Sequence, residues 1–218
     1  MKFFVGTANL KEIEEAQSLG ILDGVTTNPS LMAKEGITGS KNIINHYKKI
    51  CEIVTGDVSA EVISTDFDGI VKEGKELAAL HEQIVVKVPM ISEGIKAIKY
   101  FSENGIKTNC TLIFSAGQAL LAAKAGATYI SPFIGRIDDI SSNGIELISE
   151  IRMIFDNYNF ETEILAASIR GPMHIIDCAK IGADVVTTPL KSIKSLLNHP
   201  LTDIGLEKFL DDYKKGNK

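Results

Sequence analysis

Short apolar runs alternate with longer amphipathic segments along the whole chain. The runs are rich in β-branched residues and have the length of buried strands. They predict strands at Lys2–Gly6, Gly24–Thr27, Val58–Ile63, Ile84–Pro89, Lys107–Ile113, Tyr129–Ile134, Thr162–Ser168 and Asp184–Thr188. The amphipathic segments predict helices at Asn9–Leu19, Lys41–Thr55, Asp68–Glu82, Ser92–Asn104, Ser115–Lys124, Ser142–Asn157, Pro172–Lys180, Lys191–Leu197 and about 202–215.

Eight strands alternating with helices predict an α/β fold, a (β/α)8 TIM barrel. A weak internal repeat supports it, because residues 124–131 and 180–187 match in residue type across a helix end, a turn and a strand entry. No glycine-rich dinucleotide fingerprint or P-loop motif occurs. We expect a single domain over residues 1–218 with an extra C-terminal helix. That helix carries Leu206, Phe209 and Leu210 at helical spacing, so it packs either on a neighbouring subunit or back on its own barrel.

Composition and charge are those of a globular protein. The 218 residues are 44% hydrophobic and 23% charged, and the formal net charge of −5 argues against nucleic acid or an anionic membrane as a partner. No apolar run approaches the roughly 18 residues of a membrane span. The chain enters a strand at once, without the layout of a signal peptide. Three widely spaced cysteines, Cys51, Cys110 and Cys178, are expected to be reduced and structural in a cytoplasmic protein.

One predicted strand contains a charged residue. Lys87 lies within IVVKVPM at residues 84–90, which otherwise reads as a strand buried on both faces. An ammonium there is costly, and burial favours the neutral amine, which can attack a carbonyl. The alternative is a strand-end lysine whose stem lies on apolar surface while its head reaches water.

Other predicted strands turn polar toward their C-terminal ends. Because strand residues alternate between faces, Glu61 shares a face with Ser59, and Asn109 shares one with Thr111. In a barrel this face looks inward, and active sites lie at the C-terminal mouth. A single polar strand end usually caps the next helix or is wet at the rim, but several in phase with a buried lysine predict a site. The candidates are Thr26, Asn28, Glu61, Lys87, Asn109, Thr111, Ser131 and Ser168.

Arginine usage points to a phosphate site. Of 23 basic residues three are arginines, and Arg136 and Arg170 lie just past the sixth and seventh strands. There a bidentate guanidinium can hold a phosphate, which in such barrels often binds after strands seven and eight. The alternative for Arg136 is a salt bridge with Asp138 or Asp139. Arg152 lies mid-helix and is expected to be a solvated surface charge.

These side chains suit carbon–carbon bond cleavage through an imine. Lys87 would form a Schiff base with a ketose phosphate, and the iminium would accept the electrons of the broken bond. Glu61 and Thr111 would position a water that shuttles protons. We expect no metal ion and no other cofactor. The histidines lack ligand spacing and are expected at the surface: His46, His81, His174 and His199.

Several motifs resemble one known family over almost the whole chain. GVTTNPS at residues 24–30, KVP at 87–89, TNCT at 108–111, PFIGRIDD at 132–139 and AASIR at 166–170 are similar to the small transaldolases and the related fructose-6-phosphate aldolases. The resemblance implies a (β/α)8 barrel that transfers a dihydroxyacetone unit between sugar phosphates of the pentose phosphate pathway without a metal. It also implies a ring-shaped homo-oligomer, a pentamer or a decamer.

The resemblance also implies a role for each matching residue. Lys87 corresponds to the Schiff-base lysine, and Glu61 and Thr111 to the pair that holds the catalytic water. Two groups correspond to substrate contacts, the hydroxyl contacts Thr26, Asn28, Asn109, Ser131 and Ser168, and the phosphate contacts Arg136 and Arg170. The aldolase branch resembles a pattern with Gln in place of Glu61 and Tyr in place of Phe133. This chain therefore resembles the transaldolase branch, in which an apolar Phe133 lets the enamine wait for an acceptor aldehyde.

Position 6 departs from the family pattern. The family motif is Asp-Thr-Ala-Asn, whereas residues 6–9 here are Gly-Thr-Ala-Asn. The aspartate takes the proton of the substrate hydroxyl during cleavage, and losing a positioned base costs about 10²–10⁴-fold in rate. Gly6 indicates an engineered or trapped variant, a paralogue with weak or altered activity, or a water in place of the carboxylate. The alternatives to a transaldolase are a fructose-6-phosphate aldolase and a catalytically weak sugar-phosphate binder.

Overall fold

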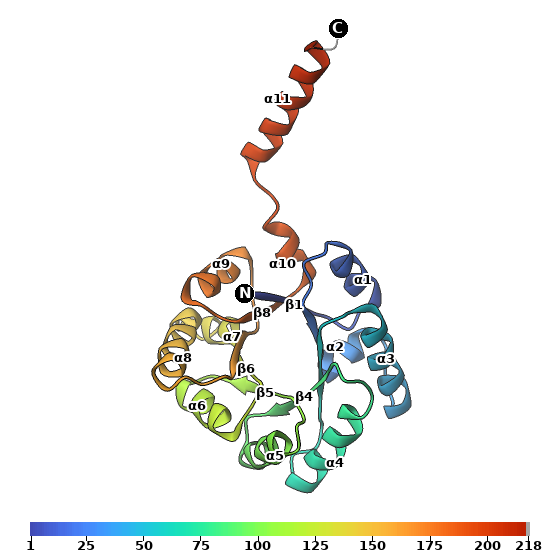
Figure 1. The fold of residues 1–218 in the computed structure, drawn as a ribbon, viewed down its shortest axis with the longest axis vertical. Coiled ribbons are helices and arrows are strands. Elements are labelled where there is room, and N and C mark those ends of the chain that lie inside the picture. Colours follow the sequence, from blue (N-terminus) through green and yellow to red (C-terminus); the bar gives the residue numbers. More distant parts are fainter. Residues whose placement is uncertain (217–218) are drawn as a thin grey trace.

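The computed structural model describes residues 1–216 as a ring of strands and helices followed by a long helix (Figure 1). The strands are β1 (Lys2–Gly6), β2 (Gly24–Thr26), β3 (Asp57–Glu61), β4 (Ile84–Pro89), β5 (Thr108–Ile113), β6 (Tyr129–Pro132), β7 (Glu163–Ala166) and β8 (Val185–Thr188). The helices are α1 (Leu10–Ser18), α2 (Pro29–Lys34), α3 (Ser40–Ile53), α4 (Phe67–Ala78), α5 (Ser92–Glu103), α6 (Ala116–Ala125), α7 (Ile134–Asp138), α8 (Gly144–Tyr158), α9 (Pro172–Ile181), α10 (Leu190–Ser195) and α11 (Pro200–Gly216).

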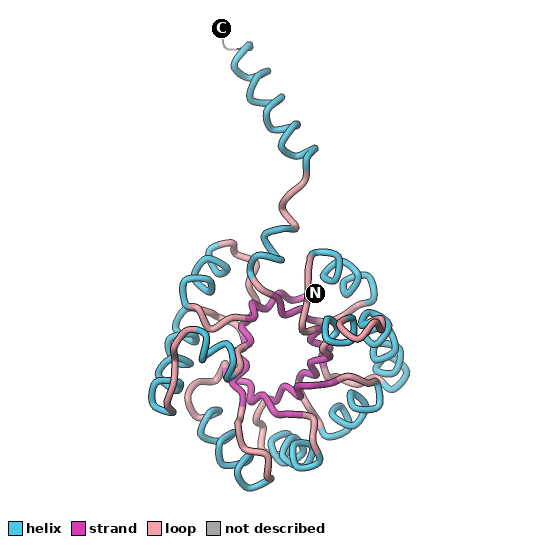
Figure 2. Tube along the Cα trace, turned by 180° about the vertical axis from the view of Figure 1, so that it is seen from behind, coloured by secondary structure: helices cyan, strands magenta, loops and turns pink. Residues whose placement is uncertain are grey.

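The strands of the described chain form a closed parallel barrel. They follow one another in chain order, and β8 pairs with β1. Figure 2 shows the closed ring of strands with helices around its outside. The register sets Glu61, Lys87 and Asn109 level on three neighbouring strands. The predicted (β/α)8 TIM barrel is therefore confirmed, and the C-terminal strand ends meet at one mouth.

Some predicted element boundaries are wrong near that mouth. Helix α2 was not predicted; it begins directly after β2 because Asn28 caps its first turn. Helix α7 was not predicted either; it begins at Ile134, so β6 ends at Pro132 rather than at 134. β7 ends at Ala166, and two residues later the backbone of Ser168 is left-handed, with φ 60°. In each case the chain leaves the sheet beside the candidate site.

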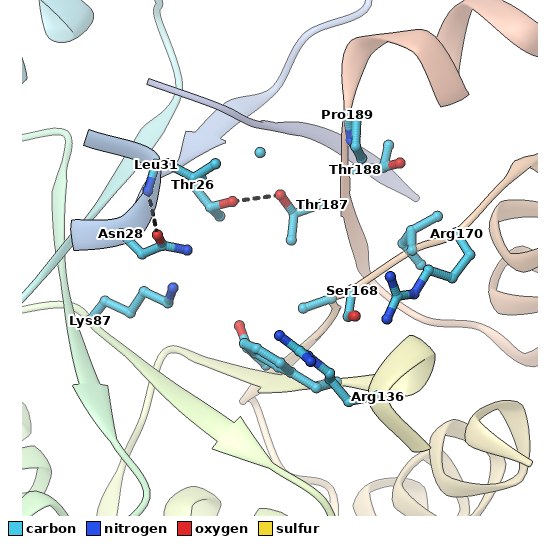
Figure 3. A pocket seen from close by; sticks show the side chains of 15 residues that line it. Thr26, Asn28, Leu31, Lys87, Arg136, Ser168, Arg170, Thr187, Thr188 and Pro189 are labelled. Atoms are coloured by element: carbon cyan, nitrogen blue, oxygen red, sulfur yellow. Dashed lines mark hydrogen bonds between the residues drawn. The ribbon is translucent and has the colours of Figure 1, made fainter. Parts of the chain in front are cut away.

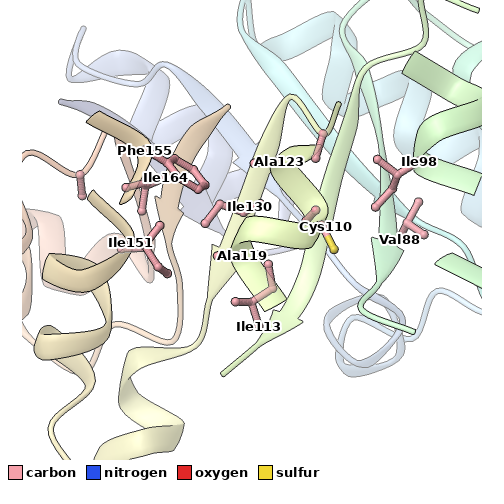
Figure 4. Close-up of a cluster of buried hydrophobic side chains, with 14 of the residues drawn as sticks. Val88, Ile98, Cys110, Ile113, Ala119, Ala123, Ile130, Ile151, Phe155 and Ile164 are labelled. Atoms are coloured by element: carbon pink, nitrogen blue, oxygen red, sulfur yellow. The ribbon is translucent and has the colours of Figure 1, made fainter. Parts of the chain in front are cut away.

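Apolar side chains fill two kinds of layer. Outside the barrel, strand residues pack against the helices, as Figure 4 shows for Val88, Cys110 and Ile130 facing Ile98 and Ala119. Inside, one cluster fills the barrel away from the mouth: Phe4, Val85, Tyr129, Leu165 and Val185. The residues two positions further along several of these strands are Gly6, Lys87 and Ser131, which share the inward face. The apolar layer thus forms the floor of a polar site.

The last helix leaves the barrel. In Figures 1 and 2 α11 projects away from the ring, and none of its residues is buried. Leu206, Phe209 and Leu210 are 57%, 72% and 50% exposed. The structure therefore shows no folding back of this helix on its own barrel. Among the described residues, no helix combines the length and apolar character needed to cross a membrane.

Three residues expected at the surface are partly buried instead. The side chain of Arg152 is 19% exposed, and its Nη1 lies 3.2 Å from Asp184 Oδ2, so it ties α8 to the start of β8. His46 Nε2 contacts a backbone carbonyl, and His174 Nε2 lies 3.1 Å from Asp138 Oδ2. Each contacts a residue distant in the sequence, which helical spacing alone does not reveal.

Candidate active site

Lys87 lies inside the barrel with its amine beside a carboxylate. The residue is 5% exposed, and its Nζ lies 2.9 Å from Glu61 Oε2 on the neighbouring strand. The same Nζ donates to the carbonyl oxygen of Thr27 at 3.4 Å. The strand-end alternative, a lysine whose head reaches water, is therefore wrong. A buried pair of this kind is costly to break, because removal of one partner leaves an uncompensated charge, at about 3–5 kcal/mol.

The amine opens into a pocket at the mouth of the barrel. The cavity has a volume of about 260 Å³. Figure 3 shows Lys87 entering from one side and Arg136 and Arg170 lying on the opposite side. The lining consists of Gly6, Thr26, Asn28, Leu31, Lys87, Ser131, Phe133, Arg136, Ala167, Ser168, Ile169, Arg170, Thr187, Thr188 and Pro189. The site thus places a buried amine opposite two cations within one small cavity.

Hydroxyl and amide groups form one wall of the pocket. Thr26 Oγ1 and Thr187 Oγ1 lie 2.6 Å apart, across the gap between β2 and β8. Asn28 Oδ1 accepts a hydrogen bond from Leu31 N at 2.8 Å. Since the oxygen of Asn28 is held by the helix, its amide nitrogen is the group left to face a ligand.

Gly6 lies between the two threonines. A Cβ at this position would lie 3.3 Å from Thr187 Oγ1 and 3.6 Å from Thr26 Oγ1. The backbone of Gly6 is not among the positive-φ glycines, so its conformation does not require glycine. A side chain fits there if the Thr187 hydroxyl shifts by a few tenths of an ångström.

Three candidate residues do not line the pocket. Glu61 lies beside Lys87, as described above. Asn109 is fully buried, donates from Nδ2 to Ser59 Oγ at 3.2 Å and accepts from Ser131 Oγ at 2.7 Å. These bonds occupy both ends of the amide, so Asn109 fixes Ser131, which does line the pocket.

Thr111 lies nearer the mouth, level with Pro89 of β4. Its Oγ1 is buried and has no hydrogen-bond partner among the described residues. Such an atom costs free energy unless a bound molecule satisfies it, so it marks a polar position for a ligand or water. Beyond it, Leu112 has φ 62° and the strand register shifts. On the outward face, burial raises the pKa of the Cys110 thiol to about 12, so this cysteine stays protonated.

The two arginines share an acidic neighbour. Arg170 Nη2 donates to Asp139 Oδ2 at 2.6 Å and to the carbonyl of Gly135 at 3.3 Å. Arg136 Nη1 is 4.0 Å from the same Asp139 oxygen. The salt bridge considered for Arg136 is thus made chiefly by Arg170. Both side chains stay more than half exposed, at 67% for Arg136 and 52% for Arg170, so both can reach a ligand.

The turn that carries Arg170 is tightly built. Ser168 adopts φ 60°, which is uncommon for a residue with a side chain. A Cβ on Gly135 would lie 2.1 Å from the Ser168 carbonyl, so glycine is needed for α7 to approach this turn. Phe133 closes the rim with an edge-on contact to Phe114, at 5.8 Å between ring centroids. Backbone strain of this kind persists where the surroundings impose it, and it clusters at functional sites.

Three residues around the site were missed by the sequence analysis. Thr187 lines the pocket, and Thr27 supplies the carbonyl that touches Lys87. Tyr47 lies on α3, and its hydroxyl accepts from Thr27 Oγ1 at 3.1 Å. Burial raises the pKa of Tyr47, with a smaller contribution from the nearby Glu61 carboxylate, so the phenol stays protonated. Each is a residue type common in strands or in the buried faces of helices, so the sequence did not indicate that it lies at a site.

Within residues 1–216, no group of three or more His, Cys, Asp or Glu side chains is placed to hold a metal ion.

Comparison with known proteins identifies the family. Residues 3–217 match the family described as Transaldolase/Fructose-6-phosphate aldolase. The chain belongs to this family. It is 70% identical to a probable transaldolase of Flavobacterium psychrophilum over 218 residues and to one of Cytophaga hutchinsonii over 217 residues. A probable transaldolase of Phocaeicola vulgatus is 68% identical over 217 residues. In each case the match covers 100% of both chains.

Membership in the transaldolase/fructose-6-phosphate aldolase family agrees with the resemblance drawn from the motifs, and the names of these relatives point to an enzyme.

Proposed function

We propose that the protein is a transaldolase that moves a dihydroxyacetone unit from a ketose phosphate to an aldose phosphate through an imine on Lys87. The observation that carries this proposal is the buried Lys87 amine, 2.9 Å from Glu61 and opposite Arg136 and Arg170 in one pocket. A phosphate held by the arginines would leave the rest of a short sugar chain extending toward the amine. The relatives named probable transaldolase support the same activity.

Imine formation needs one proton acceptor and one proton donor. Lys87 passes one proton to Glu61, and the neutral amine attacks the ketone carbon of the sugar. The carbinolamine oxygen then receives one proton from the nitrogen and one from Glu61 and leaves as water, which gives an iminium ion and returns Glu61 to its carboxylate form. Thr111 Oγ1, buried and without a protein partner, can hold the water that carries these protons.

Cleavage and transfer follow from the iminium. The bond between C3 and C4 of the sugar breaks, and its electrons enter the iminium to give an enamine. The hydroxyl on C4 loses its proton, and the aldehyde fragment leaves. Phe133 lines the pocket and offers no acid to protonate the enamine, which therefore adds to an acceptor aldose phosphate. Hydrolysis of the new imine releases the product and regenerates the amine.

Removal of the proton from the C4 hydroxyl is the step most affected by Gly6. No carboxylate stands at position 6, and the nearest groups to a Cβ built there are the hydroxyls of Thr187 and Thr26. These hydroxyls can orient a water as proton acceptor, but a water is a weaker base than a carboxylate. We therefore propose that imine formation is intact and that cleavage is slow.

The test is a transfer assay with fructose 6-phosphate as donor and erythrose 4-phosphate as acceptor. A transaldolase produces a seven-carbon ketose phosphate and little free dihydroxyacetone. Release of free dihydroxyacetone without an acceptor would instead show a fructose-6-phosphate aldolase. Binding of fructose 6-phosphate without either product would show a sugar-phosphate binder, the alternative that Gly6 favours.

We also propose that α11 joins subunits of a homo-oligomer, a pentamer or a decamer in the cytoplasm. Its Leu206, Phe209 and Leu210 side chains are at least half exposed, and the helix projects from the barrel (Figure 1). Burying them on a neighbour would remove apolar surface from water. Light scattering should give a mass of five or ten chains, and a truncation after residue 199 should lower it.

A further inference from the structure

Tyr47, on a helix outside the barrel, is connected to the lysine site through the barrel wall. Tyr47 lies on α3, among the apolar side chains that pack this helix on β2 and β3, and it is 2% exposed. Its neighbours on the same face of the helix, Ile50 and Cys51, are apolar. The hydroxyl of Tyr47 is thus a polar group in an otherwise apolar contact layer.

The Tyr47 hydroxyl connects to the amine through one residue. Thr27 Oγ1 donates to Tyr47 Oη at 3.1 Å, and the carbonyl of Thr27 accepts from Lys87 Nζ at 3.4 Å. Thr27 is fully buried, and its backbone N–H also bonds to Ser59 O at 3.3 Å. The side chain of Thr27 is therefore held on one side and its carbonyl touches the reacting group on the other.

The same hydroxyl also meets the other partner of the amine. Both the backbone N–H and the carboxylate of Glu61 act on the Tyr47 phenol, the first lowering and the second raising its pKa. Glu61 and Thr27 both contact Lys87 Nζ. Tyr47 therefore bonds to one of the two residues that hold the amine, Thr27, and is influenced by the other, Glu61.

We propose that Tyr47 is a positioning residue for the reacting amine: it holds Thr27 against β3 so that Lys87 Nζ stays between the Thr27 carbonyl and Glu61. This inference rests on the proposed imine chemistry of Lys87. Tyr47 does not line the pocket, and it acts through Thr27. Because a misplacement of about 1 Å can cost about 10²-fold in rate, loss of one hydroxyl should reduce imine formation without weakening phosphate binding.

The test uses the full-length Tyr47→Phe variant, which keeps the ring and removes only the hydroxyl. The rate of borohydride-trapped adduct formation with fructose 6-phosphate should fall by about tenfold or more. The KM for the sugar phosphate should change less than about twofold, because Tyr47 does not line the pocket that holds the arginines. Thr27→Val, which keeps the carbonyl and removes Oγ1, should give a similar loss. The double variant should be no worse than either single one, since both break the same link.

Two further measurements keep the result interpretable. Cys51→Ala removes buried volume from the same face of α3, so it should lower the thermal midpoint but leave the trapping rate unchanged. Acetylation by acetic anhydride, followed by mass spectrometry, reports the pH profile of Lys87 without any sugar, with exposed Lys99 as the internal reference. In Tyr47→Phe the Lys87 profile should move and the Lys99 profile should not.

A Tyr47→Phe protein with a wild-type trapping rate and a wild-type Lys87 profile would overturn the inference. An equal loss of trapping rate in Cys51→Ala would do so too, since packing alone would then explain it. If the wild-type protein forms no adduct with the sugar, the proposed imine chemistry fails instead, and the Lys87 acetylation profile still decides the role of Tyr47.

Discussion

Replacing Gly6 by aspartate should restore a general base to the pocket. The backbone permits it, because Gly6 does not have a positive φ. The new Cβ would lie 3.3 Å from Thr187 Oγ1, so that hydroxyl must move by a few tenths of an ångström. It can do so by loosening its 2.6 Å bond to Thr26, after which both hydroxyls can donate to the carboxylate.

The expected gain in rate follows from the step that the carboxylate would serve. A positioned general base contributes about 10²–10⁴-fold, which corresponds to about 2.7–5.4 kcal/mol of transition-state stabilisation. The tight contact with Thr187 points to the lower end, so we expect a rise in kcat/KM for transfer of about 10²-fold. The rate of imine trapping should stay within about twofold of wild type, because Gly6→Asp leaves the contacts of Lys87 in place.

The assay is transfer from fructose 6-phosphate to erythrose 4-phosphate, measured beside borohydride trapping on the same preparations. Gly6→Asn is the matched control, since it has the same shape without the base, and Gly6→Ala isolates the steric effect. Equal transfer rates for the Asp and Asn variants would refute a base at position 6. A gain in trapping rate rather than in transfer would show that Gly6 limits imine formation, contrary to our account.

Three other predictions concern the rim, the phosphate site and the acid stability. Phe133→Tyr should increase release of free dihydroxyacetone without an acceptor at least several-fold, by giving the enamine a proton donor; unchanged release, measured enzymatically, would contradict this role. Asp139→Asn should raise the KM for fructose 6-phosphate about tenfold, because it removes the carboxylate that orients the Arg170 guanidinium through a 2.6 Å hydrogen bond. It should leave kcat/KM for unphosphorylated fructose unchanged, and equal effects on both sugars would contradict this role. Burial alone would raise the pKa of Glu73, but hydrogen bonds, led by that from Ser64, outweigh it and lower this pKa. Its stabilisation is therefore present above about pH 4.3, the unfolded value, and is lost as pH falls, so thermal midpoints of wild type and Glu73→Gln should converge at low pH; a constant gap would contradict the assignment.

Local patterns were enough to predict the barrel. The run around Lys87 is short, β-branched and bounded by a proline, and each strand is followed by an amphipathic segment, so strand number and order could be inferred. The helices that were not predicted, α2 and α7, lie where tertiary contacts override the local sequence pattern. Ile134 continues an apolar run, yet it begins α7 because Gly135 lets the helix approach the Ser168 turn.

The candidate site could be assembled because strand alternation fixes which residues face inward. Glu61, Lys87 and Asn109 are level in the barrel because their strands are neighbours in register. Alternation could not show that the Asn109 amide donates to Ser59 and accepts from Ser131, since those hydrogen bonds depend on distances across the barrel. Nor could it select Tyr47, whose spacing on α3 is that of any core residue and whose role depends on a contact with Thr27.

The most direct test of the central claim is borohydride reduction in the presence of fructose 6-phosphate, read by intact mass and peptide mapping. We expect one covalent adduct per chain, located on Lys87, whose Nζ is buried 2.9 Å from Glu61 Oε2. The adduct should be lost in Lys87→Ala. An unmodified chain, or an adduct on another lysine that persists in Lys87→Ala, would contradict that claim.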